Sequence, residues 1–277
     1  MTYDELENRI AEWAATQPSI RALVVIGSRA RGTADGWSDL DMVLFSTELD
    51  RYAADSDWLK PFGDLWLVYR EMTSEGDPEW YALYEEVGLK LDLLLQQVDA
   101  DAPELETLLV EHPYKNVFTR GFRVLYDSQG EPRTIAPQPF AQPEPPTREA
   151  FDELVRQVLI DALTAAKFIA RGDYWRAQRW FAEFLRPQTL RMIEWQAYGR
   201  DTWFTGRFVE QWADPRALAA LPAIFALYER ASLEQAIRSL LRLFRWLGEE
   251  NAAKFGYSYP GEMHDPIVRL VEATFAG

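Results

Sequence analysis

Six prolines between Pro132 and Pro146 divide the chain into two stretches with different hydrophobic patterns. Proline has no backbone N–H, so a dense run of prolines does not fit a helix interior or a central strand. The run predicts a linker or a covering strap. We therefore expect two domains, at residues 1–134 and 147–277, joined by a proline-rich linker at 135–146. The full length of 277 residues is enough for each domain to bury a core of its own.

The first stretch mixes helical and strand patterns. Thr2 and Glu5 form a capping box in front of a helix expected from about Tyr3 to Ala15. Short apolar runs bounded by turn residues indicate strands. Candidate strands lie at 21–26, 40–45, 64–69, 89–95 and 122–126, and helical patterns occupy 78–87 and 103–112. This order predicts an α+β domain with a mixed β-sheet.

The second stretch has helical patterns only. Thr147 is a suitable N-cap for a helix whose apolar residues recur three or four positions apart. A final long helix is expected from Ser232, with Gln235 completing a capping box, to about Gly256. We expect this half to form an all-α bundle.

Composition narrows the possible functions. The chain has no cysteine, which excludes disulfides, thiolate zinc sites and thiol nucleophiles. The net charge of −15 argues against general affinity for nucleic acid, because that affinity comes from Lys and Arg. Such acidity suits a cationic ligand or serves solubility alone. The N-terminal residues lack a signal-peptide pattern, and no window approaches the roughly 20 apolar residues of a membrane span. We expect a cytoplasmic protein without a membrane partner.

Two polar features sit at the ends of neighbouring candidate strands. The first strand ends at Gly27-Ser28, and the next opens with Asp39 and Asp41. A Gly-Ser turn at a helix N-terminus offers backbone N–H groups and a hydroxyl to a phosphate. Carboxylates two residues apart on a strand share one face, where they can hold magnesium against nucleotide phosphates. Each piece alone is often an ordinary turn or cap, but their combination favours a nucleotide site.

Further candidates flank these two features. Arg29 and Arg31 follow the turn, where they contact a triphosphate or remain in water. In the strand at 89–95, alternation places Lys90, Asp92 and Leu94 on one face and four leucines on the other. Asp92 is thus directed away from an apolar core, unless this face is simply solvated.

The motif resembles the nucleotidyltransferase superfamily of the DNA polymerase β type, in which Gly-Ser is followed by Asp-x-Asp and by a third acid on a later strand. GSRARG, starting at Gly27, and SDLD, ending at Asp41, look like the small bacterial members. The resemblance makes Asp92 the third acid. It implies that Asp39, Asp41 and Asp92 bind Mg²⁺, and that ATP is the nucleotide donor.

The second half is similar to the helical domain of the aminoglycoside 6-adenylyltransferases that modify streptomycin. The segments that carry this likeness are 192–195, 201–208, 210–214 and 256–260. Taken together with the motif of the first half, the likeness covers nearly the whole chain. Its most specific part is the tryptophan-rich block formed by the segments 192–195, 201–208 and 210–214. The loop between Ser28 and Asp39 is shorter than in the streptomycin enzymes, which leaves the acceptor open.

The tryptophan-rich block also has a physical interpretation. Aromatic faces beside carboxylates bind polycations through cation–π contacts and charge-assisted hydrogen bonds. Glu194, Trp195, Asp201 and Trp203 are therefore candidates for binding the acceptor. Tryptophan at helical spacing is more often part of a core. Glu194 and Asp92 are the two candidates for the base that takes the proton of the attacking hydroxyl.

Taken together, these features predict magnesium-dependent transfer of AMP from ATP to a hydroxyl of a cationic small molecule. The resemblance makes that acceptor an aminoglycoside, with streptomycin as the expected example and antibiotic resistance as the consequence. A lincosamide or other small-molecule acceptor, a protein acceptor, and a non-catalytic nucleotide-binding or drug-sequestering module are the alternatives. The three intact aspartates argue against the last.

Overall fold

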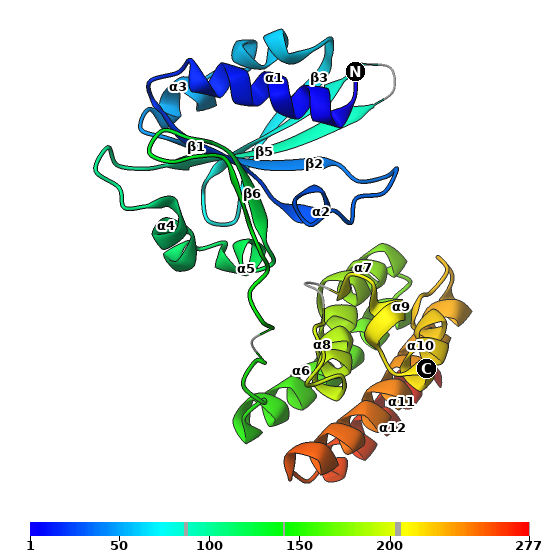
Figure 1. The fold of residues 1–277 in the computed structure, drawn as a ribbon. Helices are drawn as coiled ribbons and strands as arrows, with labels where there is room; N and C mark the ends of the chain where they lie inside the picture. The colour runs from blue at the N-terminus through cyan, green and yellow to red at the C-terminus, as the bar shows by residue number, and fades with distance from the viewer. Residues whose placement is uncertain (86–87, 141, 203–205, 277) are drawn as a thin grey trace. The chain divides into compact units, whose positions relative to one another are not determined.

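The computed structural model describes residues 1–85, 88–140, 142–202 and 206–276. The chain forms two compact units, Met1–Pro139 and Phe140–Gly277 (Figure 1). The division falls inside the proline-rich segment, which also contains the short strand β7, Arg133–Ile135. Among the described residues, no helix combines the length and the apolar character that a membrane span needs.

The N-terminal unit is built on a seven-stranded mixed sheet with the order β3-β4-β5-β2-β1-β6-β7. The remaining strands are β1 Ile20–Val25, β2 Leu40–Ser46, β3 Leu65–Met72, β4 Pro78–Tyr84, β5 Leu89–Gln97 and β6 Phe122–Asp127. The helices are α1 Tyr3–Ala15, α2 Gly27–Ala30, α3 Leu49–Ala53, α4 Leu105–Glu111 and α5 Lys115–Phe118, with a 3₁₀ turn at Asp57–Phe62. β2 and β5 pair in parallel and the other neighbours antiparallel. The predicted mixed sheet with helices is confirmed.

Alternation in β2 and β5 sorts their side chains onto two faces of the sheet. The face that packs in the larger core with α1 carries Leu40, Met42, Leu44, Leu91, Leu93 and Leu95. The opposite face carries Val43, Phe45 and Leu94, which pack with α4 and α5 in a smaller core. Figure 1 shows α1 and α3 on one side of the sheet and α4 and α5 on the other. Asp41 and Asp92 alternate with the larger core's residues and lie on the opposite face.

The predicted helix at 78–87 is wrong over residues 78–84, which form a strand. Pro78–Tyr84 forms β4, which pairs antiparallel with both β3 and β5. Trp80, Ala82 and Tyr84 are buried in the larger core, in the two-residue period of a strand. Pairing on both sides and burial of large aromatic side chains outweigh the local helical pattern.

The C-terminal unit is helical. Its elements are α6 Arg148–Ala170, α7 Tyr174–Trp180, a π-helical turn at Phe181–Leu185, α8 Arg186–Gln196, α9 Val209–Trp212, α10 Pro215–Ala220, a 3₁₀ turn at Leu221–Ile224, α11 Arg230–Phe255 and α12 Gly261–Ala276. Thr147 caps α6 as predicted, since its side chain accepts a hydrogen bond from the Ala150 N–H. One apolar core joins α6, α8, α11 and α12.

Two boundaries at the end of the chain differ from prediction. The long helix α11 begins at Arg230, two residues before the predicted Ser232, whose hydroxyl accepts a hydrogen bond from the Leu227 N–H outside the helix. It ends as predicted at Gly256, whose φ of 76° is left-handed and favours glycine. It is not the last helix, because α12 follows. Pro266 lies inside α12 and weakens the helical signal of that segment.

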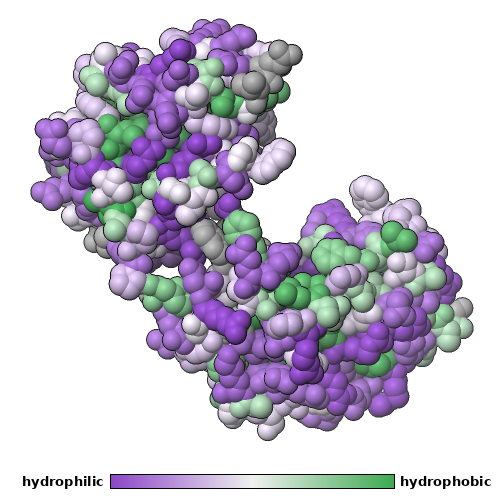
Figure 2. Space-filling view, turned by 45° about the vertical axis from the view of Figure 1, so that its right-hand side comes forward, coloured by the Kyte–Doolittle hydropathy of each residue, from purple (hydrophilic) through white to green (hydrophobic). Residues whose placement is uncertain are grey.

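The surface of both units is mostly polar. Hydrophilic side chains cover most of the face seen in Figure 2, and apolar ones form small groups, in keeping with the net charge of −15.

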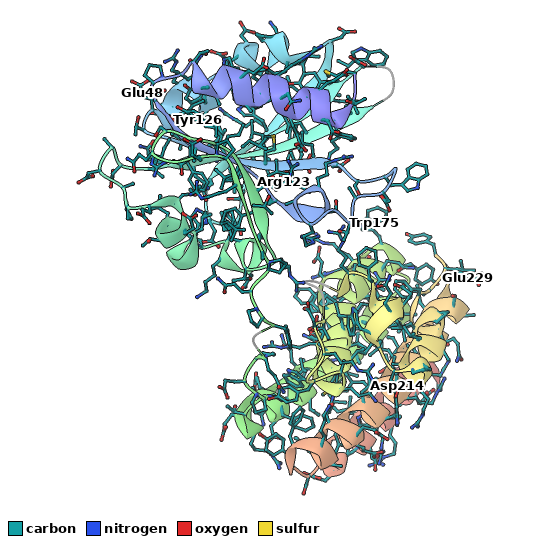
Figure 3. The ribbon with its side chains drawn as sticks, in the orientation of Figure 1. Glu48, Arg123, Tyr126, Trp175, Asp214 and Glu229 are labelled. Carbon is teal, nitrogen blue, oxygen red and sulfur yellow. The ribbon has the colours of Figure 1, made fainter. Side chains whose placement is uncertain are left out.

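An ion pair links α1 to the sheet. Arg123 of β6, labelled in Figure 3, lies 2.6 Å from the buried Glu7 of α1. This pair connects the first helix to the strand beside β1.

Candidate active site

Gly27 brings the end of β1 against Asp41 of β2. The Ile26 N–H donates to the Asp41 carbonyl at 3.0 Å, so the two strands stay paired up to the turn. Gly27 has a φ of +71°, and a Cβ added there would lie 2.4 Å from Oδ2 of Asp41. Both the backbone conformation and the close approach of the carboxylate require glycine. The Gly-Ser turn and Asp41 are therefore parts of one local structure.

The turn continues into α2, which is only one turn long. The first N–H groups of a helix have no intrahelical acceptor, so those after Gly27 are suited to an anion. The Ser28 carbonyl accepts from the Thr33 N–H at 3.0 Å, which folds the following loop back onto the turn. Because the helix is so short, the backbone N–H groups and the Ser28 hydroxyl would contribute more to binding a phosphate than a helix dipole would, and phosphate binding here stays a prediction.

Arg29 holds the loop that leads to Asp39. Its Nε donates to the Asp39 carbonyl at 3.0 Å, and its Nη2 donates to the Ser38 carbonyl at 2.8 Å. Its guanidinium carbon lies 3.4 Å from the ring centre of Tyr3 in α1. These contacts give Arg29 a role in positioning Asp39. Arg31 is the C-cap of α2, and its backbone N–H donates to the carbonyls of Arg29 and Gly27. Contact of Arg29 or Arg31 with a triphosphate stays a prediction.

The three predicted aspartates gather at one end of β2 and β5. The parallel register places Asp41 directly beside Asp92. The ammonium of Lys90 joins Asp92 to Asp39, because its Nζ lies 2.8 Å from Oδ2 of Asp92 and 2.9 Å from Oδ2 of Asp39. The side chain of Asp92 is 16% exposed and that of Asp39 is 40% exposed. The site is thus open to solvent at Asp39 and more enclosed at Asp92.

Burial and charge act against each other on these groups. Burial raises the pKa of Asp92 above its ordinary value, and the hydrogen bond and charge of Lys90 only partly oppose this. Burial lowers the pKa of Lys90, but its hydrogen bonds to Asp92 and Asp39 outweigh that effect and hold the pKa above its ordinary value. Oδ1 of Asp92 is buried and has no hydrogen-bond partner among the described residues. An unsatisfied buried oxygen is costly, and a cation bound at this position would satisfy it.

Carboxylate oxygens are the donors that Mg²⁺ prefers, so the residues present fit this ion. The buried Oδ1 of Asp92, which has no hydrogen-bond partner among the described residues, would be a further oxygen ligand for the ion. Within the described parts of the chain, however, no three acidic or histidine side chains converge as a ready-made metal cluster. Lys90 occupies the space between Asp39 and Asp92. Magnesium binding stays a prediction.

A pocket of about 160 Å³ lies beside the aspartates. Its polar lining is Asp41, Asp92, Glu79, Thr73 and Tyr114, and its apolar lining includes Val43, Leu94, Val117 and Phe118. Glu79 is absent from the predicted site because the sequence pattern predicts a helix where β4 lies. The alternation of Trp80, Ala82 and Tyr84 was the signal that could have placed it on this face. Burial raises the pKa of Glu79, although the Tyr81 hydroxyl donates to it at 2.9 Å.

The predicted acceptor residues belong to the helical unit. Glu194 lies half-buried on α8, where burial raises its pKa and the charge of Arg191 only partly opposes this. Trp195 stacks on Phe151 with ring centres 6.2 Å apart and an interplanar angle of 30°, so part of it packs on the core. Asp201 is exposed. Trp203 lies outside the described residues.

Trp212, which belongs to the same tryptophan-rich block, is a core residue. It is 6% exposed, and its Nε1 donates to the Arg207 carbonyl at 3.0 Å. The Arg200 guanidinium in turn donates to the Trp212 carbonyl at 2.9 Å. This tryptophan therefore holds α9 in place and does not present its ring to a ligand.

Comparison with known proteins gives matches along the whole chain. A family model described as streptomycin adenylyltransferase matches residues 1–273. An aminoglycoside 6-adenylyltransferase of Staphylococcus aureus is 22% identical, with 94% of each chain covered. A protein of the same name from Campylobacter jejuni is also 22% identical, with 92% of this chain and 90% of that protein covered. The crystal structure of an aminoglycoside 6-adenyltransferase from Bacillus subtilis aligns over 98% of this chain and 99% of its own, with 17% identity and a TM-score of 0.47.

Proposed function

The chain belongs to the streptomycin adenylyltransferase family, and on that premise we propose that it transfers AMP from ATP to a hydroxyl of an aminoglycoside, with streptomycin as the expected acceptor. It is a nucleotidyltransferase enzyme by family. The observation that carries the proposal for this chain is the gathering of Asp39, Asp41 and Asp92 beside the Gly27 turn. That arrangement supports nucleotide chemistry on one face of the sheet.

The reaction follows from the properties of these residues. The N–H groups and hydroxyl of the Gly27-Ser28 turn bind the phosphates of ATP. Held by Asp39, Asp41 and Asp92, Mg²⁺ would stabilise the charge on the attacking and leaving oxygens. Asp92, whose raised pKa reflects burial, accepts the proton of the attacking hydroxyl. The hydroxyl oxygen bonds to the α-phosphorus, the bond between the α-phosphorus and the bridging oxygen breaks, and pyrophosphate leaves.

The acceptor is proposed to be cationic because of charge and burial in the helical unit. Glu194 is half-buried, and its raised pKa means that its neighbours do not fully compensate the carboxylate. A guanidinium or ammonium group on the acceptor would supply that compensation through a charge-assisted hydrogen bond. The chain's net charge of −15 adds a long-range attraction for a polycation. Glu194 is therefore proposed as the anchor of the acceptor.

Substituting Glu194 and Asp92 one at a time should distinguish binding of the acceptor from the chemical step. We expect Glu194→Gln to weaken acceptor binding by roughly 1.5 to 3 kcal/mol, the usual loss when a charged hydrogen bond is removed. Asp92→Asn should cut turnover while acceptor affinity stays nearly unchanged. Both affinities are measured by calorimetry without ATP. Glu183→Gln, which removes an exposed acid of the same unit paired with Arg179, is the control and should bind like wild type. Unchanged affinity with lost turnover in Glu194→Gln would instead make Glu194 the base.

The proposal is tested directly by incubating the protein with ATP, magnesium and a panel of antibiotics. Mass spectrometry should find streptomycin, or another aminoglycoside, heavier by one adenylyl group. A modified lincosamide would keep the reaction and change the acceptor. Labelling of a protein with no modified drug would contradict the small-molecule acceptor.

A further inference from the structure

Lys90 connects two of the three acids through its side-chain ammonium. We propose that Lys90 is a positioning residue that holds Asp39 and Asp92 together until a divalent ion displaces its ammonium, and that it thereby sets how tightly the site binds metal. The inference rests on the proposed function, because it takes these carboxylates to be metal ligands. It assigns a role to a cation that the reaction itself does not use.

The contacts of Lys90 place its charge where a metal would lie. Its Nζ is within hydrogen-bond distance of Oδ2 of both Asp39 and Asp92, at 2.9 Å and 2.8 Å. The same Nζ lies 5.3 Å from the ring centre of Tyr81, which flanks the site on β4. The backbone N–H of Lys90 is fixed separately, by a 3.2 Å hydrogen bond to the Tyr3 hydroxyl. The strand is therefore anchored while the charged end of the side chain remains the movable part.

The ammonium also balances the negative charge of Asp39 and Asp92. Three carboxylates that converge without a cation repel one another, and a nearby positive charge relieves this. Lys90 supplies that charge, yet it uses one oxygen of each partner and leaves Oδ1 of Asp92 buried without a hydrogen-bond partner among the described residues. A divalent ion on the same oxygens would repel the ammonium. Metal binding and the two Lys90 hydrogen bonds therefore compete.

The chemistry of lysine suits this exchange. Its ammonium is a strongly hydrated point charge on a flexible four-carbon stem, so it can leave the acids without moving the strand. Its side chain is 39% exposed, which gives the ammonium a route to solvent. When ATP is bound, the phosphates offer the displaced ammonium a new partner of opposite charge. Nucleotide should therefore strengthen metal binding in the wild-type protein.

Mn²⁺ binding to the full chain without nucleotide tests this role, with free Mn²⁺ followed by electron paramagnetic resonance. We expect Lys90→Gln to bind Mn²⁺ about tenfold more tightly than wild type or better, because a competing charge is removed. Lys90→Arg keeps the charge and should gain no affinity. Lys60→Gln is the control for overall charge, since it removes an exposed lysine paired with Asp57, and it too should bind like wild type. Circular dichroism verifies folding, and Lys90→Met replaces the glutamine variant if that one does not fold.

The possible results distinguish the role of Lys90 from the proposed adenylyl transfer. Equal or weaker Mn²⁺ binding in Lys90→Gln, or the same gain in Lys60→Gln, would overturn the role of Lys90 and leave the reaction standing. Adding ATP should narrow the difference between wild type and Lys90→Gln, and a difference that widens would also overturn it. If no variant binds Mn²⁺ with or without ATP, the magnesium site fails and the role of Lys90 fails with it.

Discussion

Asp41→Asn should lower the rate of adenylyl transfer by at least about 100-fold, which is the scale of losing one electrostatic stabiliser of a transition state. Asp41 lies beside Asp92 in the parallel register of β2 and β5, and its carboxylate contacts the Gly27 turn. We expect the same scale of loss for Asp39→Asn, since Asp39 belongs to the same group of acids and is proposed to hold magnesium with Asp41 and Asp92.

Both variants should keep the fold, because the two side chains lie at a partly exposed site and not in a core. Initial rates give the loss of turnover, and thermal unfolding shows whether the structure is retained. Asp57→Asn is the matched control, since it changes an aspartate whose side chain is 78% exposed outside the site, and it should leave turnover unchanged. Near wild-type turnover in either Asp39→Asn or Asp41→Asn would contradict the assignment of that aspartate to the active site.

Gly27→Ala should damage the site from the backbone side. The new Cβ would lie 2.4 Å from Oδ2 of Asp41, and the residue would keep a left-handed φ of +71°. We expect the free energy of unfolding to fall by about 1 to 3 kcal/mol from the backbone strain. Displacing the Asp41 carboxylate by about 1 Å should also lower turnover by roughly 100-fold.

Gly32→Ala separates these two effects, because Gly32 lies in the same loop with a φ of +68° and open space around its Cβ position. This variant should lose a similar amount of stability and keep most of its turnover. Urea unfolding and initial rates are measured on both. If the two variants lose turnover equally, the contact between Gly27 and Asp41 is not what the reaction needs.

Features with local signals could be predicted from the sequence. The capping box of Thr2 and Glu5 marks the start of α1, and both of its hydrogen bonds are present. The alternation of leucines in β5 places Asp92 on the face opposite the larger core. These signals depend on residues close together in the chain, so they survive in the fold.

Features that depend on long-range pairing are harder to predict from the sequence. In residues 78–84 a local helical pattern competes with the two-residue alternation of Trp80, Ala82 and Tyr84, and pairing with β3 and β5 decides for the strand that brings Glu79 to the pocket. Likewise, Lys90 meets Asp39 only because β5 lies parallel to β2, a register that the sequence pattern does not contain. The positions of Arg29 against Tyr3 and the Asp39 carbonyl also depend on tertiary packing.

The fate of the phosphates of ATP tests adenylyl transfer most directly. The protein is incubated with magnesium, streptomycin and ATP labelled at either the α- or the γ-phosphate, and the drug is separated from the nucleotide products. In the proposed reaction the drug hydroxyl attacks the α-phosphorus. We therefore expect the α label in the drug and the γ label in pyrophosphate. A drug that carries the γ label would mean that the protein is a kinase and would contradict the account at its centre.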